Sequence, residues 1–422
     1  MKLRHRTGLA VLVAIMVVVA IPAAASAASL WVSPSPTITG NGRGCTEPGY
    51  NSIQAAINEA SASDTIKVCS GTYSEQLTIT KSVNLRASGT PVVKLPATPV
   101  NSTSTCGAAL AAAGNTAQDG IDVCGDITVK ASGLAIEAAW PSGTCDDDLY
   151  GIFVGGTASL SLSNSRILAA GPQPINGCQG GIGIEVGTGR TTPVETGTVT
   201  LTNVLVEGYQ KNGINIVGSG SKGTLKKVTV KGAGPTNVIA QNGIEVGENA
   251  EATISKSSSS ENVYTPQSVV STGMVVFKES VGPKVSTSTF ETDDVGIFYA
   301  ESGTATLSVT GSKFVGDTFD GVFFEEGDVV LNKDTFNGGE DGIGMYQNSS
   351  ESSGPNGTGT GDKIENMSSY AVVGFSDNAA GDPPGLFKIS HSKISNNPMG
   401  ASVQHSVFSE SNSLEISTES DT

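Results

Sequence analysis

The 422-residue chain is short of positive charge, with 24 lysine and arginine residues against 40 acidic ones and a formal net charge of −16. Nucleic acids and anionic membranes bind proteins through basic surfaces, so this balance argues against both as partners. Long apolar runs are also lacking beyond residue 21. Because a membrane-spanning helix needs about 20 predominantly apolar residues, membrane insertion of the mature chain is not expected.

The one long apolar run lies at the N-terminus. Basic residues precede the apolar residues 9–21, and the small residues 25–27 follow. This order is typical of a secretory signal peptide, which we place at residues 1–27. A membrane anchor is the alternative. The sequence therefore predicts a secreted, extracellular protein.

All six cysteines lie in the first half of the chain. An even number of cysteines in an oxidising compartment favours disulfides, here three. A zinc site is the alternative, but no Cys-x-x-Cys motif or nearby histidine supports it. The simplest pairing is sequential: Cys45 with Cys69, Cys106 with Cys124, and Cys145 with Cys178.

Residues 50–60 have the spacing of an amphipathic helix. Their apolar residues fall at i, i+3, i+4 and i+7, and Asn51 with Gln54 fits the N-cap and its reciprocal position. The apolar period then changes to two, which predicts three short strands around residues 66–68, 77–79 and 83–85. We expect the helix to cover the end of a stack of coils.

A Gly-aliphatic phrase, often preceded by Asp or Asn, recurs along the chain and predicts a solenoid. Its glycines stand at 120, 151, 183, 213, 243, 273, 296, 321 and 342, and the steps after 151 run from 21 to 32 residues. A β-sandwich would show no such repeated phrase, and the blades of a β-propeller are longer than these repeats. The Asp/Asn-Gly step is expected to supply positive φ at the coil corners, so its polar groups are interpreted as turn chemistry rather than ligands.

The N-terminal stretch resembles the entry motif of the pectin lyase-like right-handed parallel β-helix family. That motif is Ile-Gln-x-Ala-(Ile/Val)-x-x-Ala, then Asp-Thr-Ile-x-Val, then Gly-x-Tyr-x-Glu. The matching residues are Ile53, Gln54, Ala56, Ile57, Ala60, Asp64, Thr65, Ile66, Val68, Gly71, Tyr73 and Glu75. The resemblance implies an all-β, single-stranded right-handed parallel β-helix with an N-terminal helix cap. It also implies a protein that binds or processes extracellular polysaccharide.

Within that fold we expect the cap and first coils at residues 28–91 and the β-helix with its insertions at 92–405. Residues 406–422 are expected to form a polar tail. Residues 348–362 and 377–385 are polar and are predicted to be loops that leave the rod. Oligomeric state cannot be read from these patterns.

The catalytic motifs of the best-known relatives are missing. The Gly-His-Gly and Arg-Ile-Lys motifs of polygalacturonases are absent, and the later pectinesterase motifs are absent too. Pectate lyases need a calcium-binding Asp cluster with an arginine base, and Arg166 and Arg190 are the only arginines among the coils. Neither lies in the repeated phrase. Whether the chain is an enzyme therefore stays open, and the alternative is a non-catalytic structural or adhesive rod.

The outward position of the phrase gives a row of candidate site residues: Phe153, Glu185, Asn215, Glu245, Val275, Phe298, Phe323 and Gly344. Glu185 and Glu245 lie two coils, about 9.6 Å, apart, which is near the carboxylate spacing of an inverting glycosidase. They are the weak catalytic candidates. The interpretation we prefer for them is a solvated surface ladder.

Three further residues of the row are candidate substrate-binding residues. Asn215 is expected either to form a hydrogen bond with a sugar hydroxyl or to separate the charges of Glu185 and Glu245. Phe298 and Phe323 are expected either to form an apolar platform for a sugar ring or to lie beneath the loop at 348–362. No metal site is predicted, since residues 146–148 lack the spacing of a calcium loop and are interpreted as a solvated turn. Calcium is the one cofactor that the acidic composition leaves open.

Overall fold

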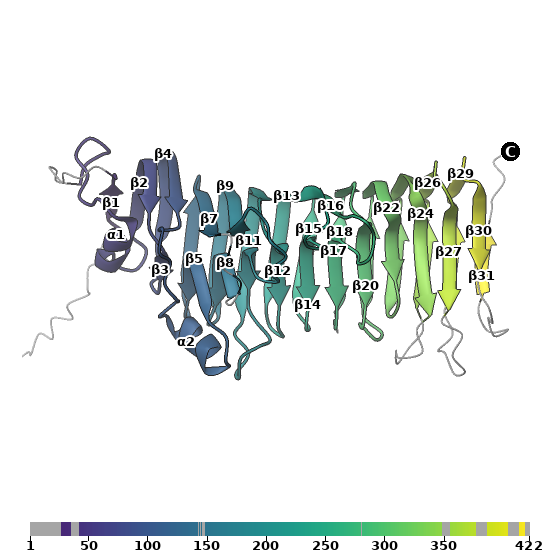
Figure 1. Ribbon diagram of the computed structural model, residues 1–422, viewed down its shortest axis with the longest axis horizontal. Coiled ribbons are helices and arrows are strands. Elements are labelled where there is room, and N and C mark those ends of the chain that lie inside the picture. The colour runs from purple at the N-terminus through teal and green to yellow at the C-terminus, as the bar shows by residue number, and fades with distance from the viewer. Residues whose placement is uncertain are drawn as a thin grey trace, which may run out of the picture.

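The computed structural model is a rod of stacked parallel coils, with helix α1 near one end and strand β31 at the other (Figure 1). It describes residues 27–34, 42–141, 143, 145, 148–279, 281–347, 355–376, 386–403 and 413–417. Each coil contributes to three sheets, here called A, B and C, that run the length of the rod. The parallel solenoid predicted from the repeated phrase is confirmed.

Sheet A carries the Gly-aliphatic phrase. It contains β3 (Leu77–Ile79), β5 (Ala117–Cys124), β8 (Asp148–Gly155), β10 (Ile182–Val186), β12 (Asn212–Val217), β14 (Asn242–Gly247), β17 (Thr272–Phe277), β20 (Val295–Ala300), β27 (Tyr370–Ser376) and β30 (Met399–Val403), and the second halves of β22 (Lys313–Phe324) and β24 (Thr335–Gln347).

Sheet B is formed by the strands that follow sheet A along each coil. It contains β1 (Ser29–Val32), β6 (Thr128–Ser132), β15 (Glu251–Ser255), β18 (Lys284–Ser286), β21 (Thr306–Thr310), β23 (Asp328–Asn332), β25 (Asn356–Thr360), β28 (Leu386–Ser390) and β31 (Ser413–Ser417), and the first halves of β2 (Thr65–Ser74), β4 (Asn84–Lys94), β9 (Ala158–Gln173), β11 (Gly197–Glu207) and β13 (Lys222–Thr236).

Sheet C completes each coil. It contains β7 (Ala135–Pro141), β16 (Ser258–Tyr264), β19 (Thr289–Glu291), β26 (Lys363–Glu365) and β29 (Lys393–Ser395), the second halves of β2, β4, β9, β11 and β13, and the first halves of β22 and β24. The inward side chains of the three sheets stack into apolar ladders that fill the rod. Ile184, Ile214 and Ile244 form one such ladder and are each no more than 1% exposed.

Helix α1 (Ile53–Glu59) is where the sequence predicts a helix, and it buries Ile53, Ala56 and Ile57. The predicted N-cap, Asn51, is wrong by one residue. Ser52 is the N-cap, and its hydroxyl accepts a hydrogen bond from the Ala55 amide. The Glu75 carboxylate accepts bonds from the amides of Ile53 and Gln54, so a residue of the first coil satisfies the amides that a helix leaves free. That α1 closes the coil stack stays a prediction.

The repeated glycines do not serve the purpose that the sequence suggests, since none of them has positive φ. They sit instead where neighbouring coils come closest. A Cβ built on Gly183 lies 2.4 Å from the carbonyl oxygen of Gly213, and one on Gly213 lies 2.6 Å from that of Gly243. The glycines therefore form a ladder in which each coil packs its backbone directly on the next.

Replacing Gly213 with alanine is expected to lower the free energy of unfolding by about 1–3 kcal/mol, because the new methyl group meets backbone that cannot move aside. The contacts are the Gly243 carbonyl oxygen at 2.6 Å and the Val230 side chain at 2.4 Å. Urea denaturation of the variant measures the change. Gly44→Ala is the control, since a Cβ there meets nothing within 4 Å. Equal stabilities for the two variants would contradict the close approach.

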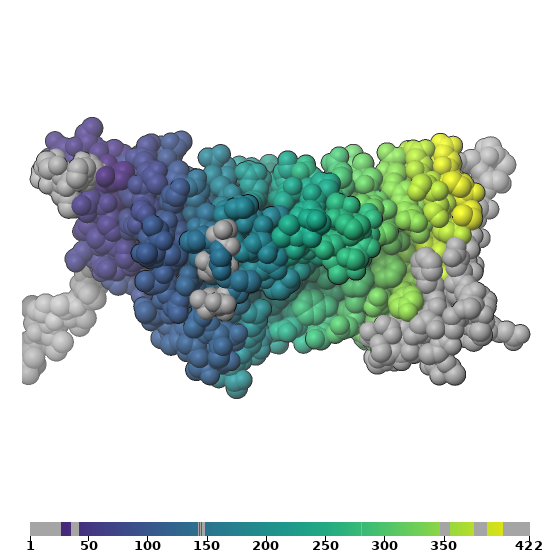
Figure 2. Space-filling model, viewed as in Figure 1, coloured from purple at the N-terminus to yellow at the C-terminus, as the bar shows by residue number. Residues whose placement is uncertain are grey.

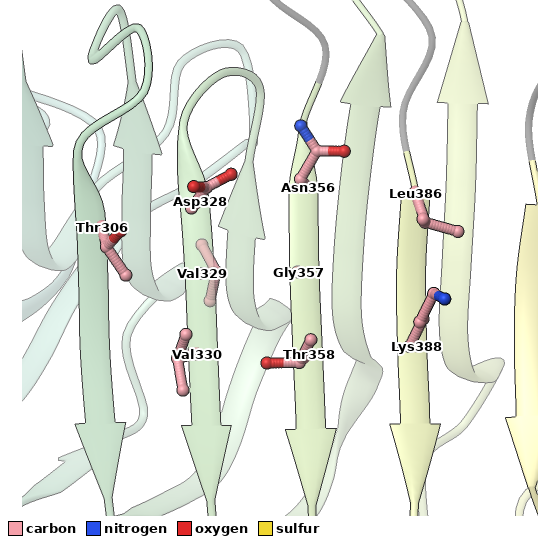
Figure 3. A pocket seen from close by; sticks show the side chains of 9 residues that line it. All are labelled: Thr306, Asp328, Val329, Val330, Asn356, Gly357, Thr358, Leu386 and Lys388. Carbon is pink, nitrogen blue, oxygen red and sulfur yellow. The ribbon is translucent and has the colours of Figure 1, made fainter.

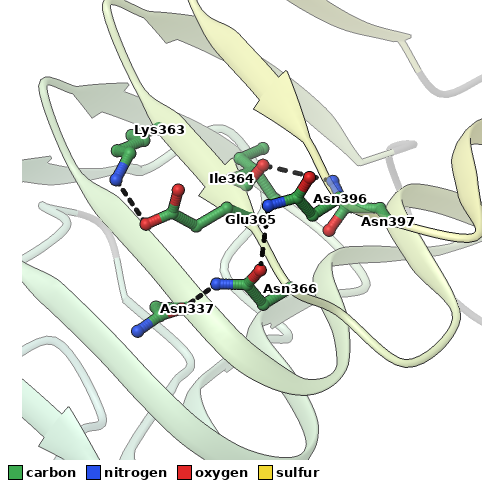
Figure 4. Close-up of polar contacts among 7 residues, drawn as sticks. All are labelled: Asn337, Lys363, Ile364, Glu365, Asn366, Asn396 and Asn397. Atoms are coloured by element: carbon green, nitrogen blue, oxygen red, sulfur yellow. Dashed lines mark hydrogen bonds and ion pairs between the residues drawn. The ribbon is translucent and has the colours of Figure 1, made fainter.

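Many of the residues with positive φ lie at the two corners that flank sheet C. Before sheet C these residues include Asn164, Asn203 and Lys256, and after it they include Asn366 and Asn396. Asparagine tolerates this conformation, and its amide can also bond along the rod. The side chain of Asn366 donates to Asn337 at 2.7 Å, and that of Asn396 donates to Asn366 at 3.3 Å (Figure 4).

Two segments near the C-terminus are more regular than the sequence suggests. Strand β25 lies within residues 348–362, which were predicted to be a loop, and it pairs with β23 and β28. Strand β31 lies within the predicted polar tail and pairs with β28. The alternating residues of Ser413–Ser417 fit a strand despite their polar surroundings. The predicted loop at 377–385 lies outside the described residues.

The six cysteines form three disulfides: Cys45–Cys69, Cys106–Cys124 and Cys145–Cys178. This is the predicted sequential pairing. The second disulfide attaches α2 (Thr105–Ala112) to the end of β5, and Leu110 of α2 packs with Tyr150 and Phe153 on the outside of sheet A. In Figure 2 the α2 segment stands out from the rod as a projection near the N-terminal end. No sequence pattern described above predicts this helix.

Candidate functional site

The row of outward residues predicted from the sequence lies in register on sheet A. Backbone pairing places Phe153, Glu185, Asn215, Glu245, Val275, Phe298, Phe323 and Gly344 in adjacent coils, in that order. Asp122 precedes the row and Val373 follows it. The structure therefore brings the candidate residues onto one face of the rod.

The interpretation of the glutamates as a solvated ladder is wrong. Glu185 is only 4% exposed and Asn215 only 5%, while Glu245 is half-buried. Part of the reason is that α2 covers the start of the row, where Phe153 is 1% exposed. The segment that follows β10 adds Arg190 close to Glu185.

Glu185 and Glu245 belong to a group that we call the polar cluster, which also contains Asp148, Tyr150, Arg190, Lys211, Asn212 and Asn215. Arg190 forms an ion pair with Asp148 at the start of β8. Asp148 is the last residue of the acidic run interpreted as a solvated turn, and it is paired instead. Its neighbours at 146 and 147 lie outside the described residues.

A second row of side chains lies three residues before the outward row in each strand. It holds the Glu245 carboxylate through hydrogen bonds. The Asn212 amide donates to the Glu245 carboxylate at 2.6 Å, and the Asn242 amide donates to Asn212 at 3.0 Å. The Thr272 hydroxyl donates to Asn242 at 2.9 Å. Asn212 and Asn242 precede the repeated glycines, so these amides form a ladder of hydrogen bonds that ends on Glu245. They are not the turn groups that the sequence suggests.

The two glutamates have different electrostatic surroundings. Burial raises the pKa of Glu185 well above its usual value, and the charge of Glu245 raises it further. Burial also raises the pKa of Glu245, but the Asn212 hydrogen bond and the charge of Lys211 act in the opposite direction. Glu245 therefore ionises before Glu185. A carboxylate beside a carboxylic acid is the arrangement that general acid–base chemistry uses.

Phe298 and Phe323 lie further along the same sheet, beyond one intervening coil. Their rings stack with centroids 5.5 Å apart and planes 6° apart, and Tyr346 continues the stack at 6.5 Å from Phe323. Each ring gives a face to its neighbour, so the pair is not a flat platform of the kind that the sequence suggests. Both rings line a hollow of about 310 Å³, the aromatic hollow, together with Val270, Val295, Phe319, Asp320, Glu340 and Asp341.

A second hollow, of about 270 Å³, lies on sheet B over β21, β23, β25 and β28. Figure 3 shows short side chains around it, with Asp328 and Asn356 at one end and Lys388 at the other. It has no aromatic residue in its lining and does not continue the predicted row.

The described part of the chain contains no group of three or more His, Cys, Asp or Glu side chains placed to hold a metal ion. Within the same residues, no helix is long and apolar enough to cross a membrane. The signal peptide expected at residues 1–27 lies almost wholly outside the described residues.

Sequence reasoning missed Arg190, Asp148, Tyr150, Lys211 and Asn212. Arg190 was set aside because it is not in the repeated phrase, yet it follows Glu185 by only five residues. Chain proximity was the available signal for it. Asp320 and Asp341 were read as turn residues, and both line the aromatic hollow.

The family model described as "Right handed beta helix region" matches residues 150–328. A comparison with curated proteins found no match. Among solved structures, the chain is similar to the A-module of the mannuronan C-5 epimerase AlgE4 of Azotobacter vinelandii, with a TM-score of 0.55 and 12% identity, covering 87% of this chain and 95% of that one.

It is also similar to the periplasmic alginate epimerase AlgG, with a TM-score of 0.50, 9% identity and coverage of 84% of this chain and 77% of that one. The Agl-KA catalytic domain has a TM-score of 0.51 and 11% identity, with 81% of this chain and 63% of that chain covered. At these identities the likeness shows the fold. The chain is a right-handed parallel β-helix, with the fold of the pectin lyase-like proteins.

Proposed function

We propose that this protein is an extracellular polysaccharide-processing protein that holds its glycan along the outward face of sheet A. The observation that carries the proposal is that one face combines the polar cluster with the aromatic hollow, one coil apart. Ligand sites characteristically combine apolar surface with a few fixed polar groups. A long polymer fits a face of this kind because equivalent positions repeat in every coil.

Glu245 is the residue that we assign to proton transfer. It is half-buried, whereas Glu185 is enclosed, so Glu245 is the more accessible carboxylate of the pair. Asn212 fixes one of its oxygens, and Lys211 lies close enough to favour its ionised form. The raised pKa of Glu185 favours its protonated form, and Glu185 acts as a positioning residue behind Glu245. Arg190, whose side chain is 53% exposed, is available to bind sugar hydroxyls.

Two further observations support the proposal. Solved proteins with a similar fold include alginate and mannuronan epimerases, which act on polysaccharides. The three disulfides suit an oxidising, extracellular compartment and agree with the signal peptide expected at residues 1–27.

Replacing Glu245 with glutamine is expected to lower turnover of the processed polysaccharide by at least about 100-fold, the range of general acid–base catalysis, while leaving binding nearly intact. The measurement is an incubation with a panel of uronate, neutral and amino polysaccharides, followed for new reducing ends, unsaturated products and changed sugar configuration. The matched control is Glu251→Gln on sheet B, where the carboxylate pairs with Lys222 in solvent.

Three outcomes separate the alternatives. Unchanged turnover in Glu245→Gln contradicts the assigned role. Binding without turnover of any polysaccharide points to the non-catalytic structural or adhesive rod. Neither binding nor turnover with any member of the panel overturns the proposed function altogether.

A further inference from the structure

The aromatic hollow is strongly acidic. Three of its lining residues carry carboxyl groups, Asp320, Glu340 and Asp341, and none of the described residues that line it is a lysine or an arginine. Asp320 and Asp341 are backbone partners in adjacent coils, about 4.8 Å apart along the rod. The hollow therefore holds closely spaced acidic groups with no cation of the protein beside them.

One of these carboxyl groups points to a ligand. Asp320 is only 8% exposed, and its Oδ1 is buried without a hydrogen-bond partner. Buried polar atoms are rarely left unpaired, because each one costs about 1–3 kcal/mol. Asp341 differs, since it accepts a hydrogen bond from the Tyr370 amide at 2.7 Å. Asp320 therefore lines the hollow with a carboxyl group that has a buried oxygen without a donor.

The lining also limits the kind of donor. The described acidic side chains are not arranged as a metal-binding group, which argues against a divalent cation. Phe298, Phe319 and Phe323 supply aromatic carbon on the same walls, and aromatic rings attract an ammonium group within about 6 Å. A negatively charged sugar would meet three carboxyl groups at short range and is disfavoured. A volume of about 310 Å³ suits one sugar residue.

We propose that the aromatic hollow is a subsite for a hexosamine residue with a free, protonated amino group, so that the glycan held along sheet A is an amino polysaccharide. The inference rests on the proposed function and specifies its substrate class. The ammonium group pairs with the carboxyl group of Asp320, and the sugar carbons pack against Phe298 and Phe323.

The surroundings of Asp320 add a measurable consequence. Burial raises the pKa of Asp320 well above its usual value, and the neighbouring Asp341 and Glu340 raise it further. Without a ligand the raised pKa therefore favours the protonated form of the Asp320 carboxyl group. A bound ammonium ion stabilises the ionised carboxylate, so binding of the hexosamine is accompanied by release of a proton.

The test is calorimetric titration of the full chain at pH 6 with three oligosaccharides: fully deacetylated glucosamine, N-acetylglucosamine and galacturonate oligomers. Each titration is run in two buffers of different ionisation enthalpy. The deacetylated oligomer is expected to bind at least about tenfold more tightly than the other two. Its binding heat should shift between buffers in the direction of proton release.

Asp320→Asn is expected to weaken binding of the deacetylated oligomer by about tenfold and to remove the buffer dependence. Asp328→Asn, on sheet B, is the matched control and should change neither. Phe323→Ala provides a second, independent variant and should weaken the same binding. Thermal melting of each variant checks that the fold is intact.

Tighter binding of the acetylated or uronate oligomer overturns the assignment of the amino sugar but leaves the proposed function standing. So does an Asp320→Asn variant that binds the deacetylated oligomer as well as the natural chain. If no deacetylated oligomer binds, the inference fails. Only failure with every polysaccharide of the wider panel also removes the proposed function.

Discussion

Replacing Leu201 with aspartate is expected to lower the free energy of unfolding by several kcal/mol, on the order of 4, because a carboxylate would be buried without a partner. Leu201 is 0% exposed and lies in a ladder between Leu162 and Leu225 in the neighbouring coils. Urea denaturation followed by circular dichroism measures the loss. If only part of the rod unfolds in the native state, the free energy of unfolding would fall less steeply with urea concentration.

Thr200→Asp is the control for that substitution, since Thr200 is exposed and adjacent in the same strand. We expect it to change stability by less than about 0.5 kcal/mol. Comparable damage from the two substitutions would show that the inward and outward positions of sheet B are reversed.

The second large effect is a loss of stability as pH rises from about 4 to 8. Burial raises the pKa of Asp293 to about 8, of Asp334 to about 7 and of Asp362 to about 6. Between the ordinary value near 4 and these values, each carboxyl is protonated in the folded state and ionised in the unfolded one. The folded state then binds more protons, so each group lowers the free energy of unfolding by about 1.4 kcal/mol per pH unit.

Urea denaturation at pH 4.5, 6 and 7.5 should therefore show steadily falling stability. Asp334→Ser is the matched variant, because serines occupy the same place in earlier coils, where the Ser312 hydroxyl accepts from the Ser288 amide. In the natural chain the Ser312 amide donates to Asp334 at 2.6 Å. The variant should lose less stability between pH 4.5 and 7. Stability that rises over this range would contradict the assigned pKa values.

The sequence was sufficient for the architecture because a solenoid repeats one local pattern. The Gly-aliphatic phrase alone locates sheet A, and the alternation around Ile184 gives the inward ladder correctly. The sequence pattern does not show why glycine occupies its position in the repeated phrase. Turn chemistry and close backbone approach both favour glycine. The φ angle of Gly183 and the distance from a Cβ built on it to the next carbonyl oxygen distinguish them.

The sequence predicts which residues of the candidate site share a face, but it does not predict how deeply they are buried. The outward row needed only the period of the repeat, so Glu185, Glu245, Phe298 and Phe323 fall on one face as expected. Burial of Glu185 could not be predicted, because it depends on segments outside the repeat. Neither the packing of α2 on sheet A nor the course of the chain around Arg190 follows any period.

The disulfides divide the rod into two parts with different mechanical character. All three crosslinks lie before residue 179, so the later coils are held by non-covalent contacts alone. In a solenoid each coil is stabilised chiefly by its nearest neighbours, and loss of the last coil exposes the one before it. We therefore expect the coils after Cys178 to open before the coils that the disulfides hold. The aromatic hollow lies further from the disulfides than the polar cluster does, so we expect its coils to separate before those of the polar cluster.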